Sequence, residues 1–360
     1  MGLRGTALAI DAGNSKTDVA LVATDGRVLG TARGGGFRPP VVGIGPAVDV
    51  LAPLVRSVLA QARLTGPVGH LSAFLANADL PVEEEGLTGE IAGRGWARTV
   101  SVRNDTFALL RAGLPDDGEG VGVAVVCGAG INCAGVGRDG ATARFPSLGR
   151  LSGDWGGGAC LAEEAMWCAA RAEDGRGAPT ALAGALPAHF GLAGMRELVE
   201  AFHLRALPGH RRHELAPLLF SVADAGDPVA RALVARQAEE IALLATVALK
   251  RLGLLGEGVP VVLGGGVLAA RHPLLHDQVI RLLSERAPEA VPHVVTAPPV
   301  WGAALDTLDR AGAGAGAYGR LRAALRAARE AGRPPAPQSP TGGAGSGAPQ
   351  SPTGSARSRT

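Results

Sequence analysis

Two stretches of the chain, 6–23 and 122–136, each show an apolar strand, a glycine-rich turn and a second apolar strand. The first turn spans 11–18 and is also rich in Asn and Ser, while the second is Gly128-Ala129-Gly130. Asp25-Gly26, just after the first unit, predicts a hairpin into a third strand. A unit that returns in the second half of the chain predicts an α/β protein with a duplicated architecture.

The remaining sequence alternates helical and strand patterns, and its 360 residues are too many for one ordinary core. We expect helices at about 46–64, 104–111, 158–172, 194–204 and 228–252 and from about 273 and 300, and strands at 68–75, 99–102, 259–263 and 290–296. The polar segment 115–120 predicts a boundary between an N-terminal domain, 1–115, and a C-terminal domain, 116–331, with the helix at about 300–313 returning to the first. Residues 332–360 hold Pro, Gly, Ser and Ala with little to bury, which predicts a disordered tail.

Composition excludes several classes of protein. A net charge of +2 gives no reason to expect nucleic acid or an anionic membrane as partner. The N-terminus does not resemble a signal peptide, and no apolar run approaches the ~20 residues of a membrane span. Four cysteines without a C-x-x-C pair indicate reduced thiols, so we expect a cytoplasmic protein.

Common nucleotide and metal motifs are absent from the sequence. There is no G-x-x-x-x-G-K-[ST] loop and no H-E-x-x-H, and the turn at 128–130 lacks the third glycine of a dinucleotide fingerprint. His272 and His276 could share a helix face, but without a third ligand they indicate a solvated surface more than a metal site.

The positive signal is a set of glycine-rich turns, each of which follows an apolar strand and exposes backbone N–H groups that suit phosphate oxygens. In the first turn, Asp11 could hold a hydrated Mg²⁺, Gly13 would let the backbone approach phosphate, and Lys16 could neutralise a phosphoryl oxygen. The simpler alternative for this turn is a polar hairpin. Asp105 could likewise be a helix N-cap or the base that accepts a proton from a sugar hydroxyl.

Taken in order, these segments resemble the N-acetylglucosamine kinase and BadF/BadG-type ATPase group of the actin, Hsp70 and hexokinase superfamily. Residues 10–18 resemble its first phosphate motif, 102–106 its N-D-[TA] motif, 128–132 its second phosphate motif, 148–158 its sugar-contacting G-D-E-G segment, 262–267 its adenosine motif and 298–304 its closing P-P-x-x-G-A-A. The matches run in the expected order over residues 8–305.

The resemblance implies two ribonuclease-H-like (actin-like ATPase) domains with ATP and sugar in the cleft between them, and a homodimer. It implies transfer of the γ-phosphate of ATP to the 6-hydroxyl of an amino sugar such as N-acetylglucosamine. Asp105 would be the catalytic base, and Asp11 would hold Mg²⁺ through water. The ATP-binding residues would be Asp11, Gly13, Asn14, Ser15, Lys16, Thr17, Gly128, Gly130, Gly264, Gly265 and Gly266, and the sugar-binding residues Asn104, Asp105, Asp154 and Trp155.

Departures from the family pattern leave alternatives open. Ile131 replaces a hydroxyl residue of the second phosphate motif, Trp155 replaces a glutamate, and 34–39 lacks the asparagine of the relatives' sugar loop. Trp155 could stack on a sugar or be a core residue. The other readings are an activator-type ATPase with an iron–sulfur cluster, a non-catalytic sugar sensor, and a kinase for glucosamine or another hexose. A free amine would favour an added carboxylate, but we expect the three glutamates at 83–85 to form a solvated loop.

Overall fold

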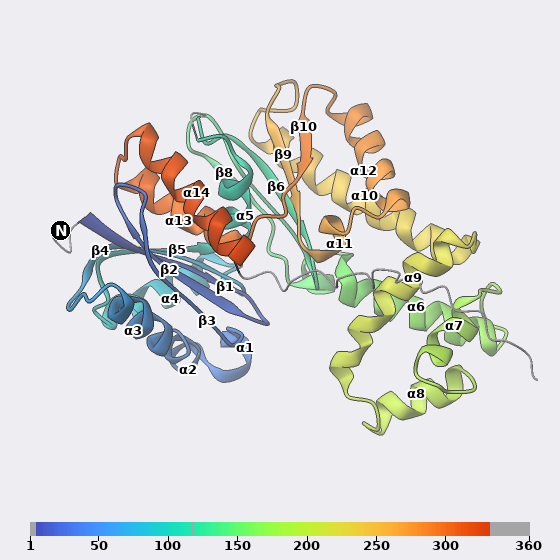
Figure 1. The fold of residues 1–360 in the computed structure, drawn as a ribbon. Helices are drawn as coiled ribbons and strands as arrows, with labels where there is room; N and C mark the ends of the chain where they lie inside the picture. The colour runs from blue at the N-terminus through green and yellow to red at the C-terminus, as the bar shows by residue number, and fades with distance from the viewer. Residues whose placement is uncertain (1–4, 117–118, 332–360) are drawn as a thin grey trace, which may run out of the picture.

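The computed structural model describes residues 5–116 and 119–331, which form two lobes, each built on a five-stranded mixed sheet (Figure 1). The strand order is β3-β2-β1-β4-β5 in the first lobe and β10-β9-β6-β7-β8 in the second. In both, an antiparallel meander of three strands is followed by two parallel strands. The two sheets therefore share one topology, and the duplicated α/β architecture is confirmed.

The bounds of most elements lie close to those expected from the sequence. The strands are β1 Thr6–Ala12, β2 Thr17–Ala23, β3 Val28–Gly34, β4 Val68–Leu75, β5 Ala97–Asn104, β6 Gly122–Cys127, β7 Ile131–Val136, β8 Thr142–Arg144, β9 Pro260–Gly264 and β10 Val291–Val294. The helices are α1 Pro39–Val42, α2 Ile44–Asp49, α3 Ala52–Gln61, α4 Pro81–Gly93, α5 Thr106–Gly113, α6 Gly157–Glu173, α7 Leu182–His189, α8 Met195–His203, α9 Leu215–Asp224, α10 Pro228–Arg251, α11 Gly266–Ala269, α12 Pro273–Arg286, α13 Pro299–Arg310 and α14 Ala315–Ala331. The tail expected from residue 332 lies outside the described residues.

Two expectations about the first lobe were wrong. The helix expected over 46–64 is two helices, α2 and α3, because Pro53 in the first turn of α3 has no N–H to donate and so starts a new helix. The glutamates at 83–85 do not form a solvated loop but lie in α4, whose start is capped by the Glu83 carboxylate. Its Oε2 accepts hydrogen bonds from the backbone N–H groups of Asp79, at 3.0 Å, and Leu80, at 2.9 Å.

One described stretch, Ile44–Gln61, has a mean hydropathy of 1.2 and is long and apolar enough to cross a membrane. It comprises α2 and α3, and its residues Leu54, Val55 and Val58 are buried in the core of the first lobe. A core helix of a water-soluble domain has the same composition, so this stretch is weak evidence for a membrane span.

A third core fills the space between the two sheets. Helix α5 follows the first sheet and packs against strands of the second, whereas α13, near the C-terminus, packs on β1, β2 and β4 of the first. The two helices cross closely at Gly302, where an added Cβ would lie 1.7 Å from the carbonyl oxygen of Ala108. Helix packing therefore requires Gly302, the glycine of the closing sequence motif, and the two packed helices join the lobes.

Candidate active site

The predicted catalytic base lies where β5 ends and α5 begins. Asn104 is the last residue of β5, and Asp105 is the N-cap residue of α5, but its carboxylate makes no capping hydrogen bond. The amide of Thr106 donates instead to Oδ1 of Asn104 at 2.9 Å. Asn104 thus satisfies the helix start, which leaves the Asp105 carboxylate available for another partner. Burial raises the pKa of Asp105 from 3.8 to about 6.

Two more carboxylates share the surroundings of Asp105. Burial raises the pKa of Asp11 to about 8, and the charge of Asp105 adds to this effect. Burial also raises the pKa of Asp79 to about 7, with further contributions from Asp105 and from Asp154 of the second lobe. Charges from both lobes therefore raise the pKa of Asp79, and carboxyl groups with raised pKa values in one place are typical of a functional site.

The first glycine-rich turn is a compact loop that is held by one backbone and one side-chain hydrogen bond. The N–H of Gly13 donates to the carbonyl of Lys16 at 2.9 Å, and Asn77 donates through Nδ2 to Oδ1 of Asn14 at 3.0 Å. The Asp11 carboxylate, at the end of β1, has no hydrogen bond or ion pair with any described residue. A buried carboxylate without a protein partner fits a Mg²⁺ ion held through water, because Mg²⁺ takes oxygen ligands and usually keeps several water molecules.

Lys16 and Thr17, both predicted to bind ATP, have different partners in the structure. Lys16 is half exposed and lies 3.7 Å from Asp18, while the hydroxyl of Thr17 donates to the carbonyl of Gly35 at 2.8 Å. Thr17 therefore fixes the segment that follows β3, and Lys16 remains the half-exposed cation of the loop.

The second and third glycine-rich turns pack directly on one another. Gly265 has φ +86°, and an added Cβ there would lie 2.5 Å from the carbonyl carbon and oxygen of Cys127, just before the second turn. Gly157 has φ +84°, and its added Cβ would lie 2.5 Å from Gly130. Only glycine permits both conformations and both approaches. Gly264 has a different role, because it packs against Leu109 of α5.

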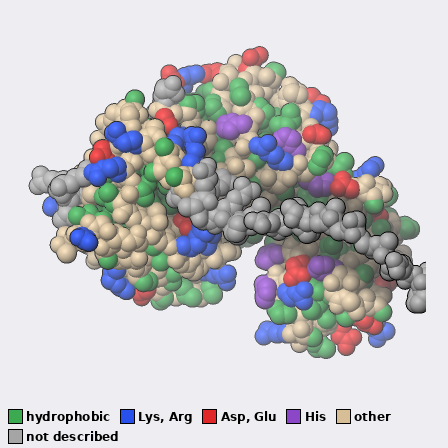
Figure 2. Space-filling view, in the orientation of Figure 1, with side chains coloured by type: hydrophobic (Ala, Val, Ile, Leu, Met, Phe, Trp, Pro, Cys, Tyr) green, Lys and Arg blue, Asp and Glu red, His purple; other side chains and the backbone are tan. Residues whose placement is uncertain are grey.

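These turns border one cavity of about 540 Å³ between the lobes. Its walls include Ser15 from the first turn, Gly128 and Ala129 from the second, and Gly266 and Val267 from the third. Figure 2 shows the surface hollowed between the two lobes. Three turns singled out separately in the sequence thus meet around a space of the size that a nucleotide needs.

The far end of this cavity is apolar and was not foreseen from the sequence. It is formed by residues of α9, including Pro217 and Phe220, and by His272 at the start of α12. The His272 ring lies 4.7 Å from that of Phe220, and its Nε2 lies 2.9 Å from Oδ2 of Asp224. His272 is therefore part of the cavity wall, and no group of metal-binding side chains was found among the described residues.

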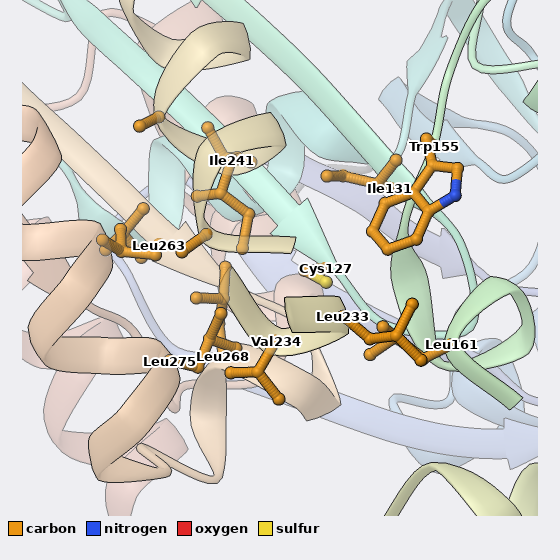
Figure 3. Packing of buried hydrophobic residues seen from close by; sticks show 14 of the residues in the cluster. Cys127, Ile131, Trp155, Leu161, Leu233, Val234, Ile241, Leu263, Leu268 and Leu275 are labelled. Carbon is orange, nitrogen blue, oxygen red and sulfur yellow. The ribbon is translucent and has the colours of Figure 1, made fainter. Parts of the chain in front are cut away.

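Asp154 and Trp155, the two predicted sugar-binding residues of the second lobe, follow a short 3₁₀ turn, Gly149–Ser152. The Ser152 hydroxyl donates to the Asp154 carboxylate. Trp155 is 5% exposed and lies beside Ile131 in the core of the second lobe (Figure 3). Its packing is therefore that of a core residue, which was one of the two alternatives expected from the sequence. One edge of Trp155 nevertheless borders a cavity of about 220 Å³ that Asp154 also lines.

Four polar residues near Asp105 were not among the predicted site residues, and Glu84 among them was expected in a solvated loop: Asp79, Glu84, Asn132 and Arg144. Asn132 donates through Nδ2 to Oδ1 of Asn104 at 3.2 Å, and Nδ2 of Asn104 donates to Asp79 at 2.8 Å. Asn132 belongs to the second phosphate motif, so the sequence could have identified it as a site residue. The other three carry no recognisable motif.

Comparison with known proteins agrees with this architecture. The family model described as BadF/BadG/BcrA/BcrD ATPase family matches residues 8–305. An N-acetyl-D-glucosamine kinase of Dictyostelium discoideum is 29% identical over 60% of this chain and 67% of its own length. An N-acetylmuramic acid/N-acetylglucosamine kinase of Clostridium acetobutylicum is 23% identical over 78% of this chain and 91% of its own.

Solved structures show the same fold. A candidate N-acetylglucosamine kinase from Chromobacterium violaceum has a TM-score of 0.64 at 24% identity, over 84% of this chain and 99% of that one. A ROK family glucokinase from Streptomyces griseus, in complex with glucose and AMPPNP, has a TM-score of 0.53 at 15% identity, over 85% and 100%. The fold is thus that of two actin-like ATPase domains around a cleft. With a family model that matches most of its length, the chain belongs to the BadF/BadG/BcrA/BcrD ATPase family.

Proposed function

We propose that the protein is an ATP-dependent sugar kinase that transfers the γ-phosphate of ATP to the 6-hydroxyl of an amino sugar, N-acetylglucosamine first among them. The observation that carries this proposal is the convergence of the glycine-rich turns on one cavity, with the Asp105 carboxylate left uncapped nearby. ATPase family membership and the names of the two curated relatives support it.

In this mechanism, Asp105 accepts the proton of the attacking hydroxyl, because its carboxylate has a pKa of about 6 and is ionised at neutral pH. The backbone amides near Gly13, Gly128 and Gly130 donate to phosphate oxygens, and Lys16 offsets charge on the transferred group. The third glycine-rich turn, at 264–266, shapes the space for adenosine. Asp11 would hold Mg²⁺ through water, and the ion would supply positive charge that offsets the charge of the phosphates.

The preference for an N-acylated sugar is supported by the small cavity beside Asp154. It is lined by Phe145, Leu243 and the edge of Trp155, which suit an acetyl methyl group. Glu240 also lines it and is the carboxylate that a free amine would favour. Arg236 lies 3.9 Å from Glu240 and already provides a counter-charge for this carboxylate. Glu240 is therefore less available to a free amine, and glucosamine is the second candidate.

An ADP-release assay with Mg-ATP tests the proposal. We expect turnover with N-acetylglucosamine that exceeds turnover with glucosamine, N-acetylmannosamine, glucose or no sugar, and that is lost in Asp105→Asn. The 6-deoxy form of N-acetylglucosamine should bind without being phosphorylated. ADP release that does not depend on a sugar would favour an activator-type ATPase, and no release at all a sensor.

The remaining parts of the proposal concern the whole protein. We propose that the enzyme is cytoplasmic and acts on a small-molecule substrate. We also propose that it forms a homodimer and that its domains span 1–115 and 116–331. Size-exclusion chromatography with light scattering would test the homodimer, because a monomer and a dimer of a 36.2 kDa chain differ twofold in mass.

A further inference from the structure

One arginine of the second lobe makes several polar contacts with the first lobe next to the proposed base. Arg144 ends β8, and its Nη1 donates to Oε2 of Glu84 at 2.7 Å. Its Nη2 donates to the backbone carbonyls of Ala78, at 3.1 Å, and Asp79, at 3.3 Å. The side chains of Arg144 and Glu84 are only 25% and 18% exposed, so this pair differs from an ordinary surface ion pair.

The residues that Arg144 contacts also hold Asn104. Oε1 of Glu84 accepts a hydrogen bond from the backbone N–H of Asn104 at 2.9 Å, while the Asp79 carboxylate accepts one from Nδ2 of Asn104 at 2.8 Å. Glu84 therefore bonds Arg144 with one oxygen and Asn104 with the other. We call Asp79, Glu84, Asn104 and Arg144 the inter-lobe clamp.

The position of Asp105 depends on this clamp. Its carboxylate makes no capping hydrogen bond, and the groups that interact with it are the backbone amides of Asp105 and Thr106, which directly follow Asn104. Its orientation therefore depends on the backbone at Asn104. Asn104 is fixed at its amide by Glu84 and at its side chain by Asp79 and Asn132. Loss of Arg144 would leave the largely buried Glu84 carboxylate without the cation that hydrogen-bonds it, and only the charge of Arg103, which forms no ion pair with it, would remain. The carboxylate would then move towards water or lose its fixed orientation. Either change weakens the hold on Asn104.

We propose that Arg144 is a positioning residue for phosphoryl transfer, which holds the base segment of the first lobe from the second lobe through Glu84. Arg144 can make these contacts only when the lobes have the arrangement seen here, so the clamp ties the position of Asp105 to that arrangement. A misplaced base reduces turnover more than it reduces substrate binding. The inference rests on the proposed sugar-kinase function.

Kinetics of Arg144→Met, Glu84→Gln and the double variant test the inference. We expect kcat with N-acetylglucosamine to fall by about 10- to 100-fold in each, with KM for Mg-ATP within about threefold of the wild type. Because the two residues act as a unit, the double variant should lose no more than the worse single variant. Arg144→Lys, which keeps the charge but has one nitrogen in place of the two that bond Glu84 and the carbonyls, should recover part of kcat. A kcat in Arg144→Met within threefold of the wild type, or losses that multiply in the double variant, would overturn the inference.

Arg94→Met is the matched control. Arg94 is 29% exposed and pairs with Glu90 and Asp49, each at 2.7 Å, but entirely within the first lobe. We expect it to change thermal stability without changing kcat. An equal loss of kcat in Arg94→Met would reduce Arg144 to a general structural role.

Amide hydrogen exchange separates this inference from the proposed function. In the full chain without ligands, Arg144→Met should speed exchange in peptides that cover 97–106 by about tenfold, and Arg94→Met should not. If the wild type phosphorylates no sugar, the proposed function fails while this measurement still tests the clamp. Unchanged exchange at 97–106 in Arg144→Met overturns it.

Discussion

Replacing Asp105 with asparagine should abolish turnover and at the same time stabilise the protein. The two side chains have nearly the same shape, so Asp105→Asn removes the charge and the ability to accept a proton while little else changes. A positioned general base contributes about 10²- to 10⁴-fold to rate, so we expect kcat to fall within or beyond that range. KM for Mg-ATP should change by less than about threefold, because Asp105 serves the acceptor hydroxyl.

The gain in stability follows from the pKa of the same group. Asp105 titrates near 3.8 when unfolded and near 6 when folded, because burial disfavours its charge. Between about pH 4 and pH 6 the folded state therefore binds the extra proton, so wild-type stability falls as pH rises through this window. A difference of about 2 in pKa corresponds to about 3 kcal/mol at pH 7, which is an upper limit. The neutral amide in Asp105→Asn carries no such penalty.

Chemical denaturation of both proteins at pH 4, 5, 6 and 7, without nucleotide or Mg²⁺, measures the effect. The two free energies of unfolding should be similar at pH 4, and the variant should become more stable by about 1 to 3 kcal/mol at pH 7. The charge of Asp105 also raises the pKa of Asp11 and Asp79, so its removal relieves both. A variant that is less stable than the wild type at pH 7, or that keeps its turnover, would refute the reasoning.

Three further predictions concern packing and the cysteines. Gly265→Ala, with φ +86° and an overlap with Cys127, should lower the free energy of unfolding by more than about 2 kcal/mol, whereas Gly266→Ala, whose Cβ meets no atom within 4 Å, should not. Gly302→Ala, which overlaps a backbone carbonyl at 1.7 Å, should cost on the order of 3 kcal/mol or more, measured by urea unfolding. Burial raises the pKa of Cys127 to about 12 and that of Cys133 further, so neither should react with a thiol reagent at pH 8 until the protein unfolds; rapid labelling of both in the native protein would contradict this burial.

The alternation of apolar strands and glycine-rich turns was sufficient to predict an α/β protein with a duplicated architecture, whereas the ribonuclease-H-like domains were expected from the resemblance to a known family. Local chemistry determines those elements: β1 and β2 are buried along their whole length, and the Asp25-Gly26 turn has the positive φ at Gly26 that its hairpin needs. The helices α4, α7, α9 and α14 were not predicted. Proline or glycine lies inside each of them, as Pro187 does in α7, so local propensity is low and packing in the tertiary structure stabilises these helices.

The site was predicted in part for the same reason. Glycine turns reveal themselves in sequence because a positive φ or a close backbone approach admits no other residue, as at Gly265. Glu84 and Arg144 carry no comparable signal, because neither has an unusual backbone and their ion pair joins a helix and a strand 60 positions apart. A charged residue on a helix is usually solvated, and only the tertiary structure shows that Glu84 faces the other lobe.

Glycine turns and side-chain contacts tolerate substitution to different degrees. The turns around the nucleotide cavity are constrained by backbone geometry, so a substitution at Gly157 or Gly265 disrupts packing between the turns themselves. Under the proposed function, the sugar is recognised by side chains, among them Trp155, which packs in the core at 5% exposure where the family pattern has a glutamate. The backbone of the turns then determines ATP binding, whereas the identity of the sugar depends on the few side chains that line the cavity beside Asp154.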